Sequence, residues 1–350
     1  MPASATDARE ERVRAAFAEQ AGWCAKLGSP FTARLCAVLG ETLDRATPTG
    51  RRALDWPGDP SSGAGALALR LCGGLHALVR AGALPALATL YPPAPMPGET
   101  ALREALRPAL ARDDLAAGLD LPPQTNEVGR SAVLYAGLLA AAGALRRPLH
   151  LLELGASAGL NLILDRYGYD LGGLATGDRA SPVQLRPTWK GAPPPDAEVP
   201  IAGRRGVDLD PPDDPERLLA YVWPDQRERL AAAAAAIGML KRDPPPRDRG
   251  DAAEWIEMQL ARPAAEGSAR IIMHSVAYQY FPAATQARVT AAIEAAGARE
   301  PLAWLRMEKR PEEEKYSLRL RLWPGGEDRL LAWVHPHGRE VRWLAEAPAR

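Results

Sequence analysis

The spacing of hydrophobic residues changes once along the chain, near residue 148. Before this point, apolar residues recur at positions i, i+3 and i+4 in several segments that prolines and glycines separate. This spacing is typical of amphipathic helices. The segments are 9–27, 30–46, 65–82, 99–115 and 125–145. We therefore expect an all-helical N-terminal region and place it at residues 1–145.

From residue 148 onward, short apolar runs alternate with glycine turns and helical patterns. The run PLHLLEL (148–154) enters a turn of small residues, and LNLILDRYG (160–168) then predicts a helix. Strands that alternate with helices indicate a doubly wound α/β sheet. Near the end, YSLRLRLW and DRLLAWV alternate polar and apolar residues, which favours antiparallel strands. We expect residues 146–350 to form such a domain.

Composition narrows the class of protein. The 350 residues are 47% hydrophobic and carry 43 basic and 43 acidic side chains, so the net charge is zero. Such a chain can bury a large core and lacks the basic surface of nucleic-acid-binding proteins. Three cysteines without a CxxC pair suit a reducing compartment. No segment has the length of a transmembrane helix or the pattern of a secretion signal. We expect a cytoplasmic protein without nucleic-acid or membrane partners, and leave its oligomeric state open.

The turn between the first strand and its helix has the sequence ELGASAGLN, residues 153–161. Gly155, Ser157 and Gly159 occupy the glycine positions of a G-x-G-x-G pattern. Without Cβ atoms, backbone N–H groups in such a turn can approach a ligand, and ligands of open α/β sheets bind at the carboxyl ends of strands. The alternative is a small-residue turn that only lets helix and strand pack closely.

Polar residues end three later segments. In GVDLDP, Asp208 ends the next expected strand, Asp251 follows RG, and His274 lies near the end of the apolar run ARIIMHS. If these strands are parallel, their polar ends meet at one edge of the sheet. An acid there can accept hydrogen bonds from two ribose hydroxyls.

These segments together resemble two families. ELGASAG, GVDLDP, RGDA and HSVAYQYFP resemble motifs of the class I S-adenosylmethionine-dependent methyltransferases, over about residues 146–335. That superfamily has a Rossmann-like sheet with a reversed final strand. ELGASAGLNLILDRYGY, QTNEVGRSA and VWPDQ resemble more closely a bacterial family known only as a domain of unknown function, DUF2332. This second resemblance implies no particular reaction.

The first resemblance implies that S-adenosylmethionine is the cofactor. Glu153 is expected near its methionine amino group, Asp208 at its ribose, and Asp251 with Ala252 at its adenine. Asn161 either turns its amide toward the ligand or bonds locally. The cofactor-binding residues that we assign are Glu153, Gly155, Ala156, Ser157, Gly159, Asn161, Asp208, Asp251 and Ala252.

The position of the second strand has an alternative. Asp208 lies 55 positions after Glu153, whereas the ordinary unit needs about 20. We therefore expect an insertion at about 168–203. If YGYDL is instead the second strand, Asp170 is the ribose acid. We prefer Asp208 because an apolar run leads into it, while glycines interrupt YGYDLGG.

The chemistry of methyl transfer needs a positioned nucleophile and sometimes a base. His274 is the candidate base, since histidine titrates near neutral pH, although a buried structural histidine is the alternative. Tyr278 and Tyr280 are expected to form pocket walls. Asn126, Glu127 and Arg130 come from QTNEVGRS, which either caps a helix or contacts the ligand. The candidate catalytic residues are His274, Tyr278 and Glu127, and the candidate substrate-binding residues are Asn126, Arg130 and Tyr280.

The function that we expect is therefore methyl transfer to an unknown small molecule, with the N-terminal helices as a lid. We expect no metal, because His335 and His337 lack the spacing of zinc ligands. Two alternatives remain open. An NAD(P)-dependent oxidoreductase would share the glycine turn but would place its ribose acid near residue 170. A non-catalytic nucleotide-ligand binding protein would keep the pocket without a productive base.

Overall fold

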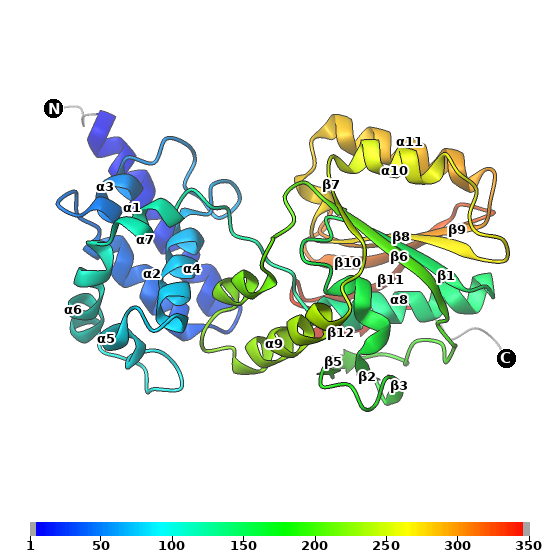
Figure 1. Cartoon of the computed structure of the whole chain (residues 1–350), viewed down its shortest axis with the longest axis horizontal. Helices are drawn as coiled ribbons and strands as arrows, with labels where there is room; N and C mark the ends of the chain where they lie inside the picture. The colour runs from blue at the N-terminus through cyan, green and yellow to red at the C-terminus, as the bar shows by residue number, and fades with distance from the viewer. Residues whose placement is uncertain (1–4, 346–350) are drawn as a thin grey trace. The chain divides into compact units, whose positions relative to one another are not determined.

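The computed structural model describes residues 5–345, which form two compact units. The first unit, here called the helical unit, contains the described residues up to Thr125 together with Asp214–Ala231. The second, the sheet unit, contains Asn126–Asp213 and the residues from Ala232 onward. Figure 1 shows the elements of both units.

The helical unit confirms the expected helical N-terminal region. Its helices are α1 (Ala5–Lys26), α2 (Pro30–Thr42), α3 (Pro48–Leu54), α4 (Leu67–Arg80), α5 (Pro85–Ala88), α6 (Glu99–Leu110), α7 (Asp113–Gly118) and the 3-10 helix η2 (Pro215–Tyr221). The apolar stripe of α4 shows why they pack, since Leu67, Leu71 and Leu75 are fully buried at helical spacing. Asp225 ties the later segment to this unit because its carboxylate accepts a hydrogen bond from Phe31 N (2.8 Å).

The sheet unit contains all the strands of the described chain. They are β1 (Leu149–Leu154), β2 (Gly168–Leu171), β3 (Leu174–Gly177), β4 (Gln184–Leu185), β5 (Thr188–Lys190), β6 (Ile201–Asp208), β7 (Arg247–Arg249), β8 (Ala269–Ser275), β9 (Leu302–Glu308), β10 (Tyr316–Trp323), β11 (Asp328–Val334) and β12 (Glu340–Trp343). The helices of this part are α8 (Arg130–Leu145), η1 (Asn161–Arg166), α9 (Arg227–Arg242), α10 (Ala252–Leu260), η3 (Tyr278–Tyr280) and α11 (Ala283–Gly297). The division between the units falls within α9.

Nine strands form one sheet in the order β5-β12-β11-β10-β9-β8-β1-β6-β7. The five strands β7, β6, β1, β8 and β9 run parallel to one another, whereas β9 to β12 pair in an antiparallel way. In chain order the parallel strands are arranged 3-2-1-4-5, as in doubly wound sheets. The expected mixed α/β fold, with a mostly parallel sheet and antiparallel C-terminal strands, is confirmed.

Helices cover both faces of this sheet. α10 and α11 pack together on one face and α8 lies on the other, against β9 and β10 (Figure 1). Every residue of β8 is buried, as expected of a central strand covered on both faces. A Cβ on Gly137 of α8 would lie 2.4 Å from Leu305 of β9, so this glycine lets helix and strand approach closely. Because of this packing, α8 belongs to the sheet unit, although its pattern resembles that of the preceding helices.

The segment after the glycine turn is not the α-helix that its apolar spacing predicts. It is the short 3-10 helix η1, and Ile163 within it has a non-helical backbone. Carbonyl groups that an α-helix would pair internally accept other donors here. Tyr167 donates to Leu160 O (2.8 Å), and Arg204 donates to Leu162 O (2.8 Å). These tertiary hydrogen bonds satisfy the backbone without regular helix.

Of the two candidate second strands, the one ending at Asp208 pairs with β1. In this parallel pair, Glu153 of β1 lies opposite Gly206 of β6. YGYDL instead forms β2, the middle strand of a separate three-stranded sheet with the order β3-β2-β4. Asp170 is exposed on this small sheet. The residues between β1 and β6 thus add a small sheet to the first crossover.

Candidate functional site

The strand ends meet as the sequence predicts. β1, β6, β8 and β9 are parallel, so their last residues share one edge of the sheet. At this edge lie Glu153 near the end of β1, Asp208 at the end of β6, Ser275 at the end of β8 and Glu308 at the end of β9. Ligands of open α/β sheets bind at this edge, beside the strand where the order reverses.

The glycine turn follows β1 directly and has an unusual backbone. Gly155 and Gly159 have φ values of +72° and +89°, and Ser157 has +49°. Few side chains adopt this left-handed region without strain. A Cβ on Gly155 would also lie 2.5 Å from the Cβ of Ala277, so the loop after β8 packs against the turn. Glycine is therefore required at position 155 both by the left-handed backbone and by the close approach of Ala277.

Most N–H groups of the turn donate within the protein. Gly155 N and Ala156 N donate to the carbonyl of Val207 in β6 (2.9 and 3.0 Å). Ser157 N donates to Oδ2 of Asp208 (2.8 Å). These bonds fasten the turn to the end of β6, and they leave fewer N–H groups for an anionic ligand.

The second half of the turn is fastened in the same way. Gly159 N donates to Ala156 O (2.7 Å), and Leu160 N donates to the side-chain oxygen of Asn126 (2.8 Å). Ala158 N is the one turn amide from 155 to 160 without a hydrogen-bond acceptor among the described residues. The turn is thus a poor cradle for phosphate, which needs several free N–H groups.

Glu153 is a buried acid beside this turn. It is 1% exposed, and burial raises the pKa of its carboxyl group well above the usual value. A hydrogen bond with Asn161 acts in the opposite direction, and the nearby charge of Asp208 raises the pKa further. Its Oε2 atom has no hydrogen-bond partner among the described residues. The hydroxyl of Ser157 is likewise buried and without a partner there.

Asn161 completes the group around Glu153. It is 1% exposed, and its side-chain oxygen accepts a hydrogen bond from the hydroxyl of Ser131 in α8 (2.7 Å). Because its amide also bonds Glu153, Asn161 is engaged locally in this conformation. These bonds fix the orientation of the Asn161 side chain beside the Glu153 carboxyl group.

Asp208 and Asp251 differ in the hydrogen bonds that their carboxylate oxygens accept. Asp208 accepts from Ser157 N through one oxygen and from Asp210 N (3.0 Å) through the other. Each carboxylate oxygen can accept a further bond. Asp251 caps α10, since Oδ1 accepts from Ala253 N (2.9 Å) and Glu254 N (3.1 Å). Its neighbour Ala252 is buried at the start of that helix. The helix cap alone explains the acid at position 251.

The segment before α8 lies beside the turn. Asn126 contacts it through Leu160, as described above, and is 9% exposed. Arg130 is 8% exposed and donates from Nη1 to Ser275 O (3.1 Å) and from Nε to Pro336 O (2.9 Å). Glu127 accepts from Gly129 N (3.1 Å). The structure thus brings Asn126 and Arg130 to the carboxyl edge of the sheet, and Glu127 lies in the segment between them.

His274 is held by partners on both ring nitrogens. Its Nδ1 lies 2.7 Å from Oε1 of Glu308, and the indole nitrogen of Trp304 donates to its Nε2 (3.1 Å). The side chain is fully buried. In this conformation no nitrogen is available to take a proton from a substrate. The geometry therefore matches the alternative of a buried structural histidine.

The two predicted pocket tyrosines lie in different surroundings. The ring of Tyr278 stacks on His274, with centroids 4.9 Å apart, and its hydroxyl donates to Gln286 O in α11 (2.7 Å). Tyr280 is 65% exposed. Tyr278 therefore packs against the ring of His274, while Tyr280 lies at the surface.

Two residues of this edge were missed from the sequence. Glu308 ends β9 just as Glu153 and Asp208 end their runs, so the signal of an apolar run leading into an acid was present in LAWLRMEK. Leu209 is 74% exposed directly after Asp208.

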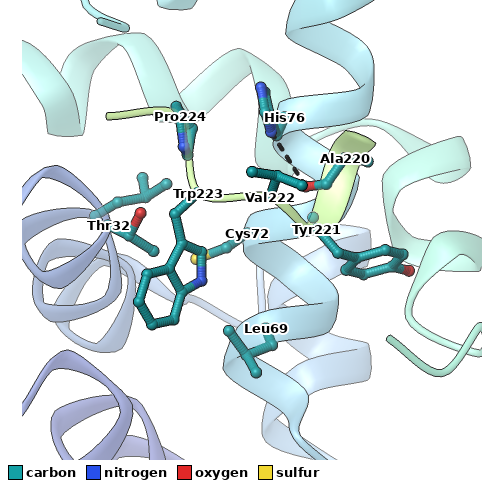
Figure 2. A pocket seen from close by; sticks show the side chains of 11 residues that line it. Thr32, Leu69, Cys72, His76, Ala220, Tyr221, Val222, Trp223 and Pro224 are labelled. Carbon is teal, nitrogen blue, oxygen red and sulfur yellow. Dashed lines mark hydrogen bonds between the residues drawn. The ribbon is translucent and has the colours of Figure 1, made fainter. Parts of the chain in front are cut away.

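The helical unit has a pocket of its own. Its volume is about 20 Å³, which suits about one water molecule. Figure 2 shows Thr32, Cys72, His76 and Trp223 among its lining side chains. Burial lowers the pKa of His76 to about 4, and its Nδ1 lies 3.1 Å from Ala220 O. Ligand pockets measure several hundred Å³, so we place the functional site at the sheet edge instead.

Residues 5–345 offer neither a metal site nor a membrane-spanning helix. These residues include no group of three or more His, Cys, Asp or Glu side chains arranged to hold a metal ion. None of their helices combines the length and the apolar character that crossing a membrane requires.

Comparison with known proteins adds a family but no activity. The family model described as "Uncharacterized protein conserved in bacteria (DUF2332)" matches residues 14–343. No curated protein matches the chain. The matched range includes nearly all of both units, so the family is defined by the helical and the sheet parts together.

Proposed function

The chain belongs to the DUF2332 family of uncharacterised bacterial proteins, and from this premise we propose that it binds S-adenosylmethionine and transfers its methyl group to a small molecule. The site is the carboxyl edge of β1, β6 and β8. The 3-2-1-4-5 order supports this location, because ligands of doubly wound sheets bind where the order reverses.

One observation carries the proposal: acids of the adjoining strands lie beside the glycine turn, and few N–H groups of the turn are free. Glu153 has a buried oxygen without a partner, and Asp208 lies at the adjacent strand end. A cationic ligand group would satisfy Glu153 and favour its charged form. S-adenosylmethionine carries a sulfonium, an ammonium group and a ribose diol, and has no phosphate.

The same observation disfavours an NAD(P)-dependent oxidoreductase. A dinucleotide needs free turn amides and a helix N-terminus for its pyrophosphate. Here the amides of Gly155, Ala156 and Ser157 donate to β6, and the following segment is the 3-10 helix η1.

The chain's residues would bind and orient the cofactor, which supplies the electrophilic methyl group when bound. We assign Glu153 to the methionine ammonium group and Asp208 to the ribose hydroxyls. The exposed side chain of Leu209 would contact the adenine, near Asp251 and Ala252. Asn126 and Arg130 would lie on the acceptor side. The role of the N-terminal helices as a lid stays a prediction, as does a cytoplasmic location.

Isothermal titration tests the choice of ligand. We expect S-adenosylmethionine and S-adenosylhomocysteine to bind and to raise the melting temperature, since a ligand selective for the native state stabilises it. NADH should do neither. Binding of NADH without binding of S-adenosylhomocysteine would reject the proposal in favour of an oxidoreductase.

A second candidate function is ligand binding without catalysis. It is favoured by the engagement of both nitrogens of His274 and of the Tyr278 hydroxyl, which leaves these two groups unavailable as bases. Incubation with S-adenosylmethionine labelled in its methyl group and a bacterial small-molecule extract separates the two. Transfer of label to an extract component supports an enzyme, whereas binding without transfer supports a binding protein.

A further inference from the structure

Glu308, the last residue of β9, uses its two carboxylate oxygens very differently. Oε1 accepts from His274 Nδ1 (2.7 Å), Ala277 N (3.0 Å) and Tyr278 N (3.1 Å). Oε2 is buried and has no hydrogen-bond partner among the described residues. The residue as a whole is 7% exposed. A buried acceptor without a donor is costly, so an unmade bond at this position calls for an explanation.

The first oxygen holds the loop that follows β8. This loop is strained, because Val276 has a φ of +52°, which β-branched residues rarely adopt. The bonds to Ala277 N and Tyr278 N keep it in place. Ala277 in turn packs against Gly155, as the close approach of its Cβ shows. Glu308 is thereby connected to the glycine turn through a single residue.

Polar and aromatic groups gather at the same edge of the sheet. Tyr316 begins β10, and its neighbour Ser317 pairs with Glu308. Burial raises the pKa of Tyr316, and Tyr280, Gln279, Arg130 and Glu308 also affect it, so these groups lie near its hydroxyl. Tyr280 is largely exposed. Beside the proposed cofactor site there is thus a second cluster, with aromatic rings and one unsatisfied carboxylate oxygen.

We propose that Glu308 binds the methyl acceptor and that the acceptor presents an amine or a hydroxyl group, whose N–H or O–H donates to Oε2. This inference rests on the proposed function. Such a donor removes the free-energy cost of burying Oε2 without a hydrogen bond. A nucleophile bound in this way is oriented by a group that can also accept its proton. An acceptor atom without hydrogen, such as an ether oxygen, leaves Oε2 unsatisfied.

The variant Glu308→Gln distinguishes the role of Oε2 from that of Oε1. Its amide oxygen can still accept from His274, Ala277 N and Tyr278 N, while an NH₂ group replaces Oε2 and cannot accept. We therefore expect the loop to keep its structure. The matched control is Glu312→Gln, which removes a carboxylate that is 60% exposed and pairs with Arg310.

The probes are benzylamine, benzyl alcohol and benzyl methyl ether, whose ring suits the aromatic cluster. Each is titrated into protein saturated with S-adenosylhomocysteine. We expect the amine or the alcohol to bind at least about tenfold more tightly than the ether, as hydrogen bonds to charged groups allow. Glu308→Gln should abolish this preference and leave S-adenosylhomocysteine affinity unchanged. Glu312→Gln should change neither.

A measurement on the unaltered protein tests the inference even if the variant does not fold. Nuclear magnetic resonance should show the His274 Nδ1–H signal shifting with the amine or the alcohol and not with the ether, because this proton shares the carboxylate. Equal binding of all three probes, no binding of the amine and alcohol, or an unchanged preference in a folded Glu308→Gln would overturn the inference. Failure of S-adenosylhomocysteine to bind is the separate failure of the proposed function, and the probes are then titrated alone.

Discussion

The indole nitrogen of Trp304 donates a hydrogen bond to Nε2 of His274 across 3.1 Å. An indole N–H can only donate, so Nε2 carries no proton, and the ring proton is on Nδ1. That proton faces Oε1 of Glu308. The relationship makes His274 a neutral link between two residues of β9 and explains why a histidine so well placed at a strand end is not free to act as a base.

Replacement of His274 should therefore lower the free energy of unfolding more than replacement of a less buried histidine would. His274→Ala leaves the Trp304 indole and the Glu308 carboxylate without this partner in a buried place, which costs about 2–4 kcal/mol. Guanidinium denaturation followed by tryptophan fluorescence measures this loss. His150→Ala, at a less buried position of β1, serves as the control. Unchanged stability together with lost methyl transfer would restore the catalytic role.

Glu153 should make stability depend on pH. Because burial raises its pKa, the native state favours the protonated form. The stability that this acid contributes is present below its usual pKa of 4.5 and is lost as pH rises toward the raised native value. Glu153→Gln resembles the protonated form, so its advantage over the unaltered protein should grow between pH 5 and pH 8. Urea denaturation at both values measures the difference, and a constant difference would contradict the burial argument.

Asp208 and Asp170 should differ in ligand binding. Asp208→Ala is expected to weaken S-adenosylhomocysteine binding by about 1–3 kcal/mol, the loss expected when hydrogen bonds to a charged group disappear. Asp170→Ala should have little effect, since this residue is exposed and accepts a hydrogen bond from Gly173 N of its own turn (2.9 Å). Titration calorimetry compares them. Asp208→Asn keeps an acceptor for Ser157 N and shows whether any loss comes from the turn. The reverse ranking of the two alanine variants would move the ribose site.

Leu209 should affect binding without affecting stability. Its side chain is 74% exposed, so Leu209→Ser removes little buried surface from the free protein. If the adenine covers it, the variant should lose about 1 kcal/mol of S-adenosylhomocysteine binding through lost apolar contact. Met258→Ser is the matched control, because Met258 is 62% exposed on α10. Equal effects of the two variants would argue against an adenine contact at Leu209.

His76 should make the helical unit sensitive to acid. Its pKa is lowered to about 4, mainly by burial, so the native state favours the neutral ring. The stability it contributes is present above the usual pKa of 6.5 and is lost as pH falls toward 4, by roughly 3 kcal/mol in total. His76→Gln should show a smaller acid loss in urea denaturation at pH 7 and pH 4.5. An identical loss in both proteins would mean that His76 does not titrate with unfolding.

The sequence by itself determined those elements that are specified by the local spacing of apolar and small residues. Apolar residues at helical spacing specified α1, α2, α4 and α6, because each of these helices buries one stripe. Small residues between an apolar run and a second apolar segment located the turn after β1, because left-handed backbone and close approach exclude most side chains. The run leading into Asp208 identified the strand beside β1.

Only the tertiary structure decided what depends on residues distant in the chain. In η1, Leu162 O accepts from Arg204 of β6, and the preceding Leu160 O accepts from Tyr167, which favours an irregular segment over the α-helix that the spacing predicts. α8 joins the sheet unit because Gly137 admits Leu305 of β9. His274 is unavailable as a base because Trp304 and Glu308 approach it from the adjacent strand. A local pattern cannot show these effects, since each arises when side chains that lie far apart in sequence compete for the same hydrogen bond or the same space.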